Sequence, residues 1–466
     1  MKKEKREAKP GPRLVVSSLI STEAGHTLVR QTVNTTAEKS LLLTKDVAFN
    51  SILTNVSWLT FDKVFRIGIG ILVGAWVARY LGPAQYGLLN YALSFTALFG
   101  VFAGLGLEGI VVRELVRFPE KTDIILGTTF YLRLIGGLIA FLLSVMTIFV
   151  FRSDDTLLLY LVTLCAGGFL FQSFLVIDLY YQAHIKSKYT VWAQTIAFTI
   201  ISFTKILLII KKASVLAFGV AAMIEIAITV FFLLLFFYLN KLSIRKWQFS
   251  SSTATHLLGA CIPMIISFFA TTISLRIGQI ILFNLLDSTS LGIFNASSTI
   301  VEVFFFVPVV ISTSIFPYFV NKNHNDTETY LHSKRNTFIL FLAIALCISL
   351  SIHFFSDYIV SLLYGKHFAQ SAYLLKYQVF GIIFVFHVSL RKKMLLVENK
   401  IRVVMIYSLL AGLFALPSYY LLIRSYGLFG AVAGFLLVWF FGAIVAPAFA
   451  RRFKEDVLLI KGPTSS

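Results

Sequence analysis

The sequence predicts an all-α polytopic membrane protein with twelve transmembrane helices arranged as two related bundles of six. Three observations carry this prediction: the composition, the length and number of the apolar segments, and short matches between the two halves. Of the 466 residues, 58% are hydrophobic and only 14% are charged, whereas soluble globular chains average about 45–50% apolar and about 25% charged residues. The 46 Phe also favour contact with lipid over a compact core in water.

The net charge of +19 comes with no nucleic-acid-binding motif, and we interpret it as a signal of membrane topology. The three cysteines, Cys165, Cys261 and Cys347, all lie in apolar runs without metal-ligand spacing. They do not form the pattern of a disulfide framework. The sequence therefore predicts no metal site and no cofactor.

Twelve segments are long and apolar enough to cross a bilayer, whose core of about 30 Å needs about 20 residues of helix. They are residues 52–80, 85–106, 125–151, 157–182, 190–210, 215–240, 258–286, 290–320, 336–355, 374–396, 403–423 and 427–450. An even number of spans places both termini on the same side of the membrane.

The Lys and Arg residues indicate which side this is. With the N-terminus inside, the inner loops and the C-terminal tail hold twenty Lys and Arg, and the outer segments hold six. Because basic residues accumulate in cytoplasmic loops, we expect both termini to be cytoplasmic, in the inner membrane of a bacterium.

The apolar pattern divides the chain into five parts. Residues 1–50 are a basic extension that lacks the apolar core of a signal peptide, and we expect it to be disordered and cytoplasmic. Residues 51–240 form the N-terminal bundle and residues 258–450 the C-terminal bundle. They are joined by the basic linker 241–257 and followed by a cytoplasmic tail, 451–466.

The two bundles share short sequence matches. Residues 81–92, LGPAQYGLLNYA, align with 286–297, LDSTSLGIFNAS, so that Gly87 meets Gly292. A second match pairs FGVAA with FGAVA at a similar offset. Many transporters consist of two related bundles, and we expect these two to be related by a pseudo-twofold axis.

Charges within the spans are the candidate functional residues, because such charges are costly and usually face a bundle interior or a hydrated cavity. They are Asp62, Lys63, Arg66, Arg79, Arg133, Asp178, Lys205, Glu225, Arg276 and Glu302. Arg66 and Arg276 lie deepest among the basic residues, roughly 15–20 Å from the nearer span end at the helical rise of 1.5 Å per residue. Glu302 is similarly deep.

Structural explanations compete with the functional one. Arg79 and Lys205 can reach the interface as snorkelling side chains, and Asp62 can pair with Arg66 four residues away on one helix face. Arg66 and Arg276 nevertheless lie in the first span of each half, with Lys63 beside Arg66. A cleft between the halves lined by these cations favours an anionic substrate, since Arg binds phosphate with two hydrogen bonds. Glu302, Asp62 and Glu225 are candidates for coupling transport to an ion.

The run VGAWVARYLGPAQYGLLNYALSFTALFGVFAGLGLEGIVVREL, residues 73–115, closely resembles the start of bacterial polysaccharide flippases. These form the O-antigen-transporter-like branch of the multidrug/oligosaccharidyl-lipid/polysaccharide exporter superfamily. Further similar stretches are DLYYQAHIKSKY (178–189), IPMIISFFA (262–270), LGIFNASSTIVEVFFFVP (291–308) and LYGKHFAQSAYLL (363–375). The resemblance extends from about residue 50 to about residue 450.

The resemblance implies two six-helix bundles around a central V-shaped cavity that opens alternately to each side. It also implies the function of a flippase that moves a polyprenyl-pyrophosphate-linked oligosaccharide from the inner to the outer leaflet. On this basis Arg66 and Arg276, with Lys63 second, would engage the pyrophosphate. The partners would be this lipid-linked glycan, membrane lipids and other polysaccharide-assembly proteins, and we expect the protein to act as a monomer.

Two other functions remain open. A multidrug or cation antiporter of the same superfamily would have the same number of spans but would need acidic cavity residues such as Glu302, Glu225 and Asp62. A non-transporting membrane scaffold would need exposed domains for its partners, and the loops are short. An enzyme is not expected, because no loop is large enough for a catalytic domain and no phosphate-binding Walker loop is present.

Overall fold

The computed structural model describes the backbone of residues 23–312, 315, 319, 327–398 and 400–446. The side chains of 23–62, 64, 327–331 and 401 are not described. The chain divides into two compact units, residues 1–58 and 59–466, which we describe separately.

In the first unit, the described residues belong to the beginning of α2 (Glu23–Gly104). Residues 23–50 are therefore helical where the sequence predicts disorder, and residues 1–22 lie outside the described part of the chain. The stretch from His26 to Ile67 contains neither glycine nor proline, the residues that most disfavour helix. The prediction of disorder rested on charge and hydropathy and did not take the lack of helix-breaking residues into account.

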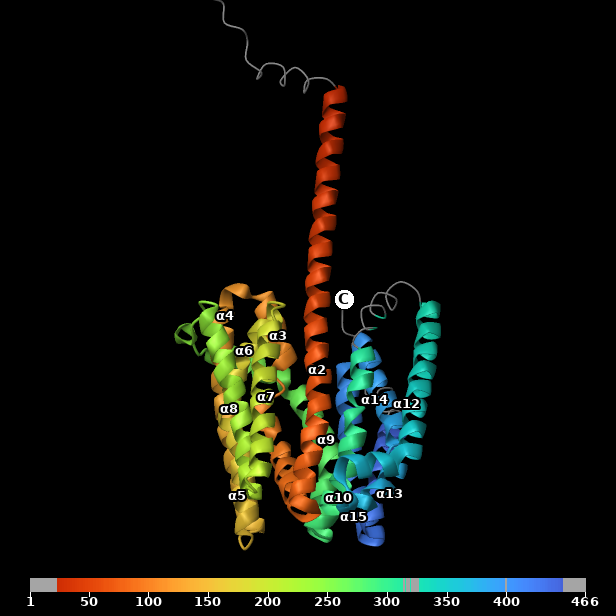
Figure 1. The fold of residues 1–466 in the computed structure, drawn as a ribbon. Coiled ribbons are helices and arrows are strands. Elements are labelled where there is room, and N and C mark those ends of the chain that lie inside the picture. Colours follow the sequence, from red (N-terminus) through yellow and green to blue (C-terminus); the bar gives the residue numbers. More distant parts are fainter. Residues whose placement is uncertain (1–22, 313–314, 316–318, 320–326, 399, 447–466) are drawn as a thin grey trace, which may run out of the picture. The chain divides into compact units, whose positions relative to one another are not determined.

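The described residues of the second unit form helices and turns and contain no β-strand (Figure 1). After α2 the elements of the N-terminal half are α3 (Glu108–Arg117), η1 (Pro119–Lys121), α4 (Thr122–Phe151), α5 (Thr156–Gly167), η2 (Gly168–Leu170), η3 (Gln172–Leu175), α6 (Val176–Ala183), α7 (Lys188–Ile210), α8 (Val215–Leu239) and η4 (Ile244–Lys246). Those of the C-terminal half are α9 (Ser251–Leu285), α10 (Ser288–Val303), α12 (Thr327–Tyr364), η5 (Lys366–Phe368), α13 (Ala369–Gln378), α14 (Gly381–Val397), α15 (Ile401–Phe440) and the π-helix η6 (Phe441–Val445).

Within the described residues, eight helices are long and apolar enough to cross a membrane. The number is ten if each of two bent pairs, 156–183 and 366–397, is one span. The predicted spans 157–182 and 374–396 correspond to these bent pairs, whose helices meet at 42° and 52°. The all-α membrane fold is thus confirmed, while the number twelve stays a prediction.

Two of the eight long helices contain a break where the sequence predicts a turn between spans. In α2 the backbone of Gly82 has φ 69° and ψ 170°, and in α15 that of Gly427 has φ 56° and ψ −130°. Only glycine adopts such positive φ values readily, and Pro83 follows the first break without a backbone N–H. Dividing both helices at these breaks would add two spans to the ten.

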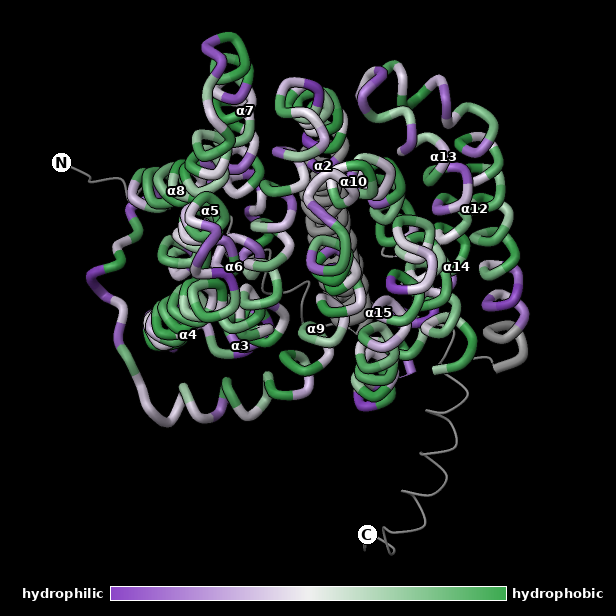
Figure 2. Tube along the Cα trace, turned by 90° about the horizontal axis from the view of Figure 1, so that it is seen from below, coloured by the Kyte–Doolittle hydropathy of each residue, from purple (hydrophilic) through white to green (hydrophobic). Residues whose placement is uncertain are grey.

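Apolar side chains cover the outside of the second unit. Phe151, Phe354 and Phe203 are 77%, 75% and 64% exposed, and hydrophobic residues dominate the helices in Figure 2. Large apolar groups exposed in such number mark a surface that meets lipid rather than water. The chain is a multi-pass membrane protein.

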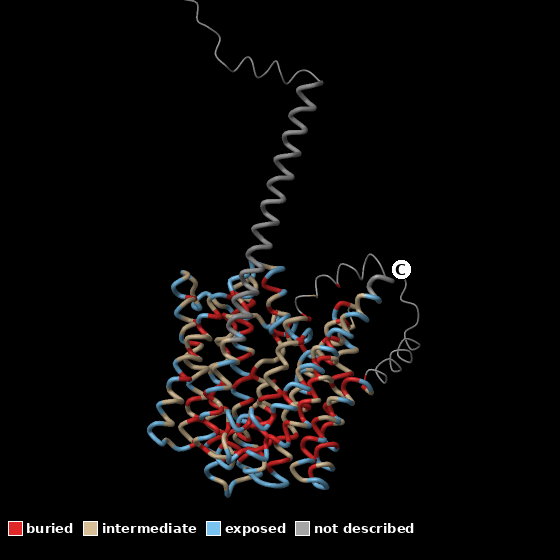
Figure 3. The backbone as a smooth tube through the Cα atoms, turned by 45° about the vertical axis from the view of Figure 1, so that its right-hand side comes forward, coloured by how far each residue is buried: buried red, intermediate tan, exposed pale blue. Residues whose placement is uncertain are grey.

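The largest buried cluster connects the two halves within the second unit. It includes Leu89 and Ala92 of α2 together with Leu291 and Phe294 of α10 and Leu374 of α13, and buried residues gather in the lower part of Figure 3. Polar contacts between the halves lie in the same region. The guanidinium of Arg152 donates to Oδ1 of Asn284 at 2.6 Å, and the hydroxyl of Ser94 donates to Oε1 of Gln279.

A reciprocal glycine contact lies within this interface. A Cβ on Gly87 would be 1.8 Å from the carbonyl oxygen of Ser288, and a Cβ on Gly292 would be 1.9 Å from that of Pro83. The sequence offset that relates Gly87 to Gly292 also relates Pro83 to Ser288. Each half therefore presents the same pair of positions to the other half. This is the pattern of a two-fold contact, in which residue i meets j and j meets i. It supports the proposed duplication of the two halves.

Candidate functional site

The N-terminal half contains a cavity of about 190 Å³ between α2, α7 and α8. Its walls are mostly apolar, with a few polar groups. The lining residues are Gly70, Val73, Gly74, Val77, Tyr86, Leu89, Asn90, Leu93, Phe198, Ser202, Lys205, Phe218 and Ala222. Apolar walls with a small number of polar groups are typical of binding sites in proteins.

Arg66 lies beside this cavity, one helix turn before Gly70. Its Nη1 donates a hydrogen bond to Oε1 of Gln194 on α7 at 3.1 Å, and its guanidinium carbon lies 6.0 Å from the ring centre of Phe198. Phe198 in turn lines the cavity and packs at Gly70. The structure thus places the guanidinium at the junction of α2 and α7, partly exposed.

Lys205 lies in the wall of the same cavity and forms an ion pair. Its Nζ is 3.6 Å from Oε2 of Glu225 on α8, and the two side chains are 26% and 32% exposed. Gln194 and Lys205 are eleven residues apart on α7, which corresponds to about 16 Å along the helix. Two cations therefore accompany the cavity, Arg66 near one end and Lys205 near the other.

Arg276 and Glu302 form a bidentate ion pair between α9 and α10. Nη1 and Nη2 of the arginine lie 3.2 and 3.3 Å from the two carboxylate oxygens, and the side chains remain 31% and 29% exposed. Glu302 also acts electrostatically on the phenols of Tyr86 and Tyr419. Because Tyr86 lines the N-terminal cavity, this ion pair lies near the cavity from the side of the other half.

The remaining predicted residues are less well placed. Lys63 is exposed, and the side chain of Asp62 lies outside the described residues, so its predicted pairing with Arg66 stays a prediction. The two predicted arginines lie in different halves. Arg66 of α2 contacts α7, and Arg276 of α9 contacts α10.

Sequence reasoning overlooked two residues of these cavities. Lys205, interpreted as a snorkelling side chain, lines the N-terminal cavity. Lys392, which is not among the predicted site residues, lines a second, smaller pocket in the C-terminal half, described below. A signal for the first was available. Lys205 and Glu225 carry opposite charges on consecutive spans joined by the short turn 211–214, so the two helices must be neighbours.

Known structures share this fold. The chain is similar to an inward-facing multidrug resistance MATE family transporter of the MOP superfamily, with a TM-score of 0.66, 13% identity and coverage of 85% of this chain and 96% of that one. It is also similar to the lipid II flippase MurJ in an inward closed conformation, with a TM-score of 0.65, 13% identity and coverage of 87% and 93%. The fold is therefore that of MOP superfamily transporters.

Sequence comparison defines the family more narrowly. A model of the family "Polysaccharide biosynthesis protein" matches residues 52–323, more than half of the chain. The chain belongs to this family, which confirms the resemblance inferred from the sequence. The Lsg locus putative protein 1 of Haemophilus influenzae is 23% identical over 275 residues, which span 55% of this chain and 66% of that protein.

Proposed function

We propose that this protein is a flippase that moves a polyprenyl-pyrophosphate-linked oligosaccharide, a repeat unit of a polysaccharide, from the inner to the outer leaflet of the cytoplasmic membrane by alternating access. Both termini would be cytoplasmic, and the protein would act as a monomer beside other polysaccharide-assembly proteins. Family membership and the MurJ-like fold support a lipid-linked glycan as the substrate class.

The observation that carries the proposal is the cavity of about 190 Å³ with Arg66 beside it and Lys205 in its wall. A pyrophosphate cannot enter hydrocarbon unaided, because burying charge without partners is prohibitively costly. Fixed cations beside a partly open cavity would replace the water that solvates the pyrophosphate outside the membrane. The cavity is smaller than the roughly 300–1,000 Å³ of typical ligand pockets, so we assign to it the charged link of the substrate and not the oligosaccharide.

The Arg276–Glu302 pair suggests how substrate and ion could be coupled. While Glu302 is ionised, its two hydrogen bonds hold Arg276. A proton on Glu302 would remove its negative charge and release the guanidinium for a phosphate oxygen. Glu302 is thus the first candidate for ion coupling, and Glu225, paired with Lys205 in the cavity wall, is the second.

A cation antiporter is less well supported. Such a protein needs a carboxylate that is available to a cationic substrate. Glu225 and Glu302, the two carboxylates that the structure places near the cavity, are each ion-paired with a basic side chain. Because the same pairs also occupy Lys205 and Arg276, Arg66 beside the cavity and the family membership are what favour an anionic substrate.

The test is to delete the gene and extract the lipids from the cells. The proposal predicts that polyprenyl-pyrophosphate oligosaccharide accumulates on the inner leaflet, and that Arg66→Ala and Arg276→Ala fail to restore export at normal expression. Lys at either position should restore part of it, because the charge is kept. Lys211→Ala, in an exposed turn, serves as the control. Normal export by both alanine variants would contradict the anion site, and unchanged lipids after deletion would contradict the flippase.

A further inference from the structure

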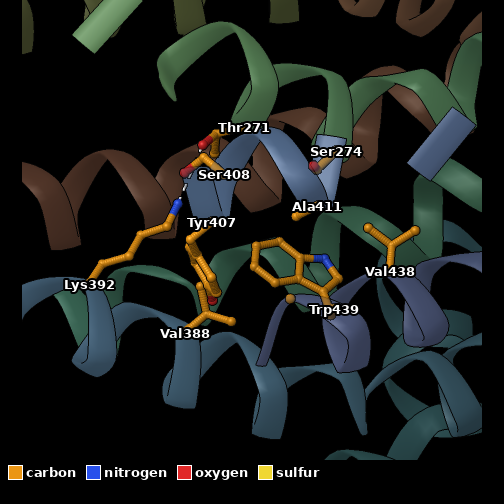
Figure 4. Close-up of a pocket in the computed structure, with 10 residues that line it drawn as sticks. Thr271, Ser274, Val388, Lys392, Tyr407, Ser408, Ala411, Val438 and Trp439 are labelled. Atoms are coloured by element: carbon orange, nitrogen blue, oxygen red, sulfur yellow. Dashed lines mark hydrogen bonds between the residues drawn. The ribbon is translucent and has the colours of Figure 1, made fainter. Parts of the chain in front are cut away.

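A second, separate pocket lies within the C-terminal half, between α9, α14 and α15. It has a volume of about 30 Å³, enough for one or two water molecules or a monatomic ion, since a single water needs about 10–15 Å³. Figure 4 shows the ammonium of Lys392 at one end, next to Thr271 and Ser408, with the ring of Tyr407 beside it and Trp439 in the middle.

Lys392 reaches deep into this pocket. Its Nζ donates to Oγ1 of Thr271 at 3.4 Å and lies 5.6 Å from the ring centre of Tyr407. Thr271 is fourteen residues from the end of α9 at Leu285, or about 21 Å along the helix. In a bilayer core of about 30 Å, the ammonium therefore lies about 21 Å from that side and about 9 Å from the other, where α14 ends at Val397, five residues after Lys392.

No carboxylate balances this charge among the described residues. In the C-terminal half these include four acidic side chains, and each is engaged elsewhere. Glu302 pairs with Arg276, Glu398 with Lys334 and Lys400, and Asp357 with Lys376, while Asp287 accepts a hydrogen bond from the backbone of Ser290 at the start of α10. Charges at such depth are normally paired or serve a ligand.

Of the other polar groups that line the pocket, the hydroxyls of Thr271 and Ser274 already donate to the backbone carbonyls of Ser267 and Ala270, whereas two further donors lack an acceptor. The hydroxyl of Tyr407 and Nε1 of Trp439 are buried and have no hydrogen-bond partner among the described residues. The hydroxyl oxygen of Ser408 already accepts from Ser267 at 3.1 Å, which leaves its own proton to donate. Next to the pocket, Arg391 adds a second positive charge and donates to the carbonyl of Ala443.

From this arrangement we propose that the pocket between Lys392, Thr271 and Ser408 binds a small monovalent inorganic anion of the size of chloride. The charge of Lys392 calls for a negative partner, and the hydroxyl of Ser408 supplies a further hydrogen bond, while that of Thr271 already donates to the carbonyl of Ser267 and only positions the ammonium. The volume excludes a phosphate ester or a sugar. Since the pocket is lined by three helices, the bound anion links α14 to α9 and α15 and stabilises the packing of this half.

Thermal unfolding of the purified full-length protein in detergent tests this proposal. The unfolding midpoint is measured from chloride-free to chloride-rich buffer, with gluconate replacing chloride at constant ionic strength. We expect a saturable rise of about 2 °C or more, because a ligand that binds only the folded state stabilises it by mass action. Bromide should act like chloride.

Two variants show whether the effect arises in this pocket. Lys392→Met should lose the saturable rise, and Lys392→Arg should keep part of it. Lys393→Met, which removes the neighbouring charge outside the pocket lining, should respond like the wild type. A pocket that holds only water would give no chloride dependence in the wild type. That result, or an equal dependence in Lys392→Met, would overturn the proposal.

Discussion

The cavity of the N-terminal half and the pocket of the C-terminal half each have a lysine in their walls, but the two lysines are balanced differently. Lys205 lies 3.6 Å from the carboxylate of Glu225 in a cavity of about 190 Å³. Lys392 lies over a tyrosine ring in a pocket of about 30 Å³ and has no carboxylate partner among the described residues.

If the halves arose by duplication, as we propose, their polar groups have since diverged. The two halves share a reciprocal glycine contact, while the charges inside them are arranged differently. The larger cavity, with Arg66 beside it, is the one that we assign to the charged link of the substrate. The smaller pocket suits only an ion or water.

The largest expected effect tests what the halves have in common. Gly87→Ala and Gly292→Ala should each reduce export more than tenfold, because the new methyl group would lie 1.8 or 1.9 Å from a carbonyl oxygen of the other half. The two halves must then separate at this contact. Export in the deletion strain is the measurement, and Gly104→Ala, whose Cβ would meet nothing within 4 Å, is the control. Normal export by either variant would show that the contact is absent in the working protein.

A second prediction concerns the ion pair between α9 and α10. Arg276→Ala leaves Glu302 without its partner and, as its expected failure to restore export requires, should lower export by at least about tenfold, equivalent to at least about 1.4 kcal/mol. The double variant Arg276→Ala/Glu302→Gln should regain the lost thermal stability but not the export. If the double variant exports normally, the pair is structural and Arg276 does not contact substrate.

Replacing each of the two lysines should shift the thermal unfolding midpoint in opposite directions. Lys205→Met should lower the unfolding midpoint, because Glu225 would lose its partner. Lys392→Met should raise it in chloride-free buffer, because an unbalanced charge is removed from an apolar region. Each change should be about 1 kcal/mol, since both sites are partly exposed and partly screened. Midpoints that move in the same direction would remove the distinction between the two cavities.

The smallest effect concerns Glu398 at the end of α14. Burial alone would raise its pKa, but hydrogen bonds and charge from Lys334 and Lys400 outweigh burial and lower the pKa to about 2 from its usual 4.5. Between these two values the unfolded chain binds more protons than the folded one, so stability falls as the pH falls. The contribution is complete above about pH 5 and is lost progressively toward pH 2.

Thermal midpoints measured from pH 7 to pH 3 check this. The wild type should lose more stability than Glu398→Gln below pH 4.5, and the two should run parallel above pH 5. A parallel course over the whole range would mean that the carboxylate is not held by the two lysines in the folded protein.

Much of the architecture follows from local sequence features. The all-α membrane fold and the family resemblance are confirmed, and the predicted turns near residues 82 and 427 coincide with glycines of positive φ. These features depend on residues next to one another in the chain. The helical conformation of residues 23–50 was missed because the prediction considered their charge and not their lack of helix-breaking residues.

The candidate site was predictable only in part. The depth of Arg276 and Glu302 in their spans follows from counting residues, but their bidentate pairing does not. Pairing depends on how each helix is rotated about its axis and on the register between helices, and each residue turns the helix face by about 100°. Lys392 was not predicted as a site residue for the same reason, because its long side chain reaches inward from a position near the end of α14.

The sequence by itself determined that this chain is a multi-pass membrane protein built of helices, and it located the breaks near residues 82 and 427, because apolar length and glycine positions are local properties. Only the tertiary structure decided which charges neutralise one another and which line a cavity. Those contacts join residues far apart in the chain, and their geometry depends on how the helices pack.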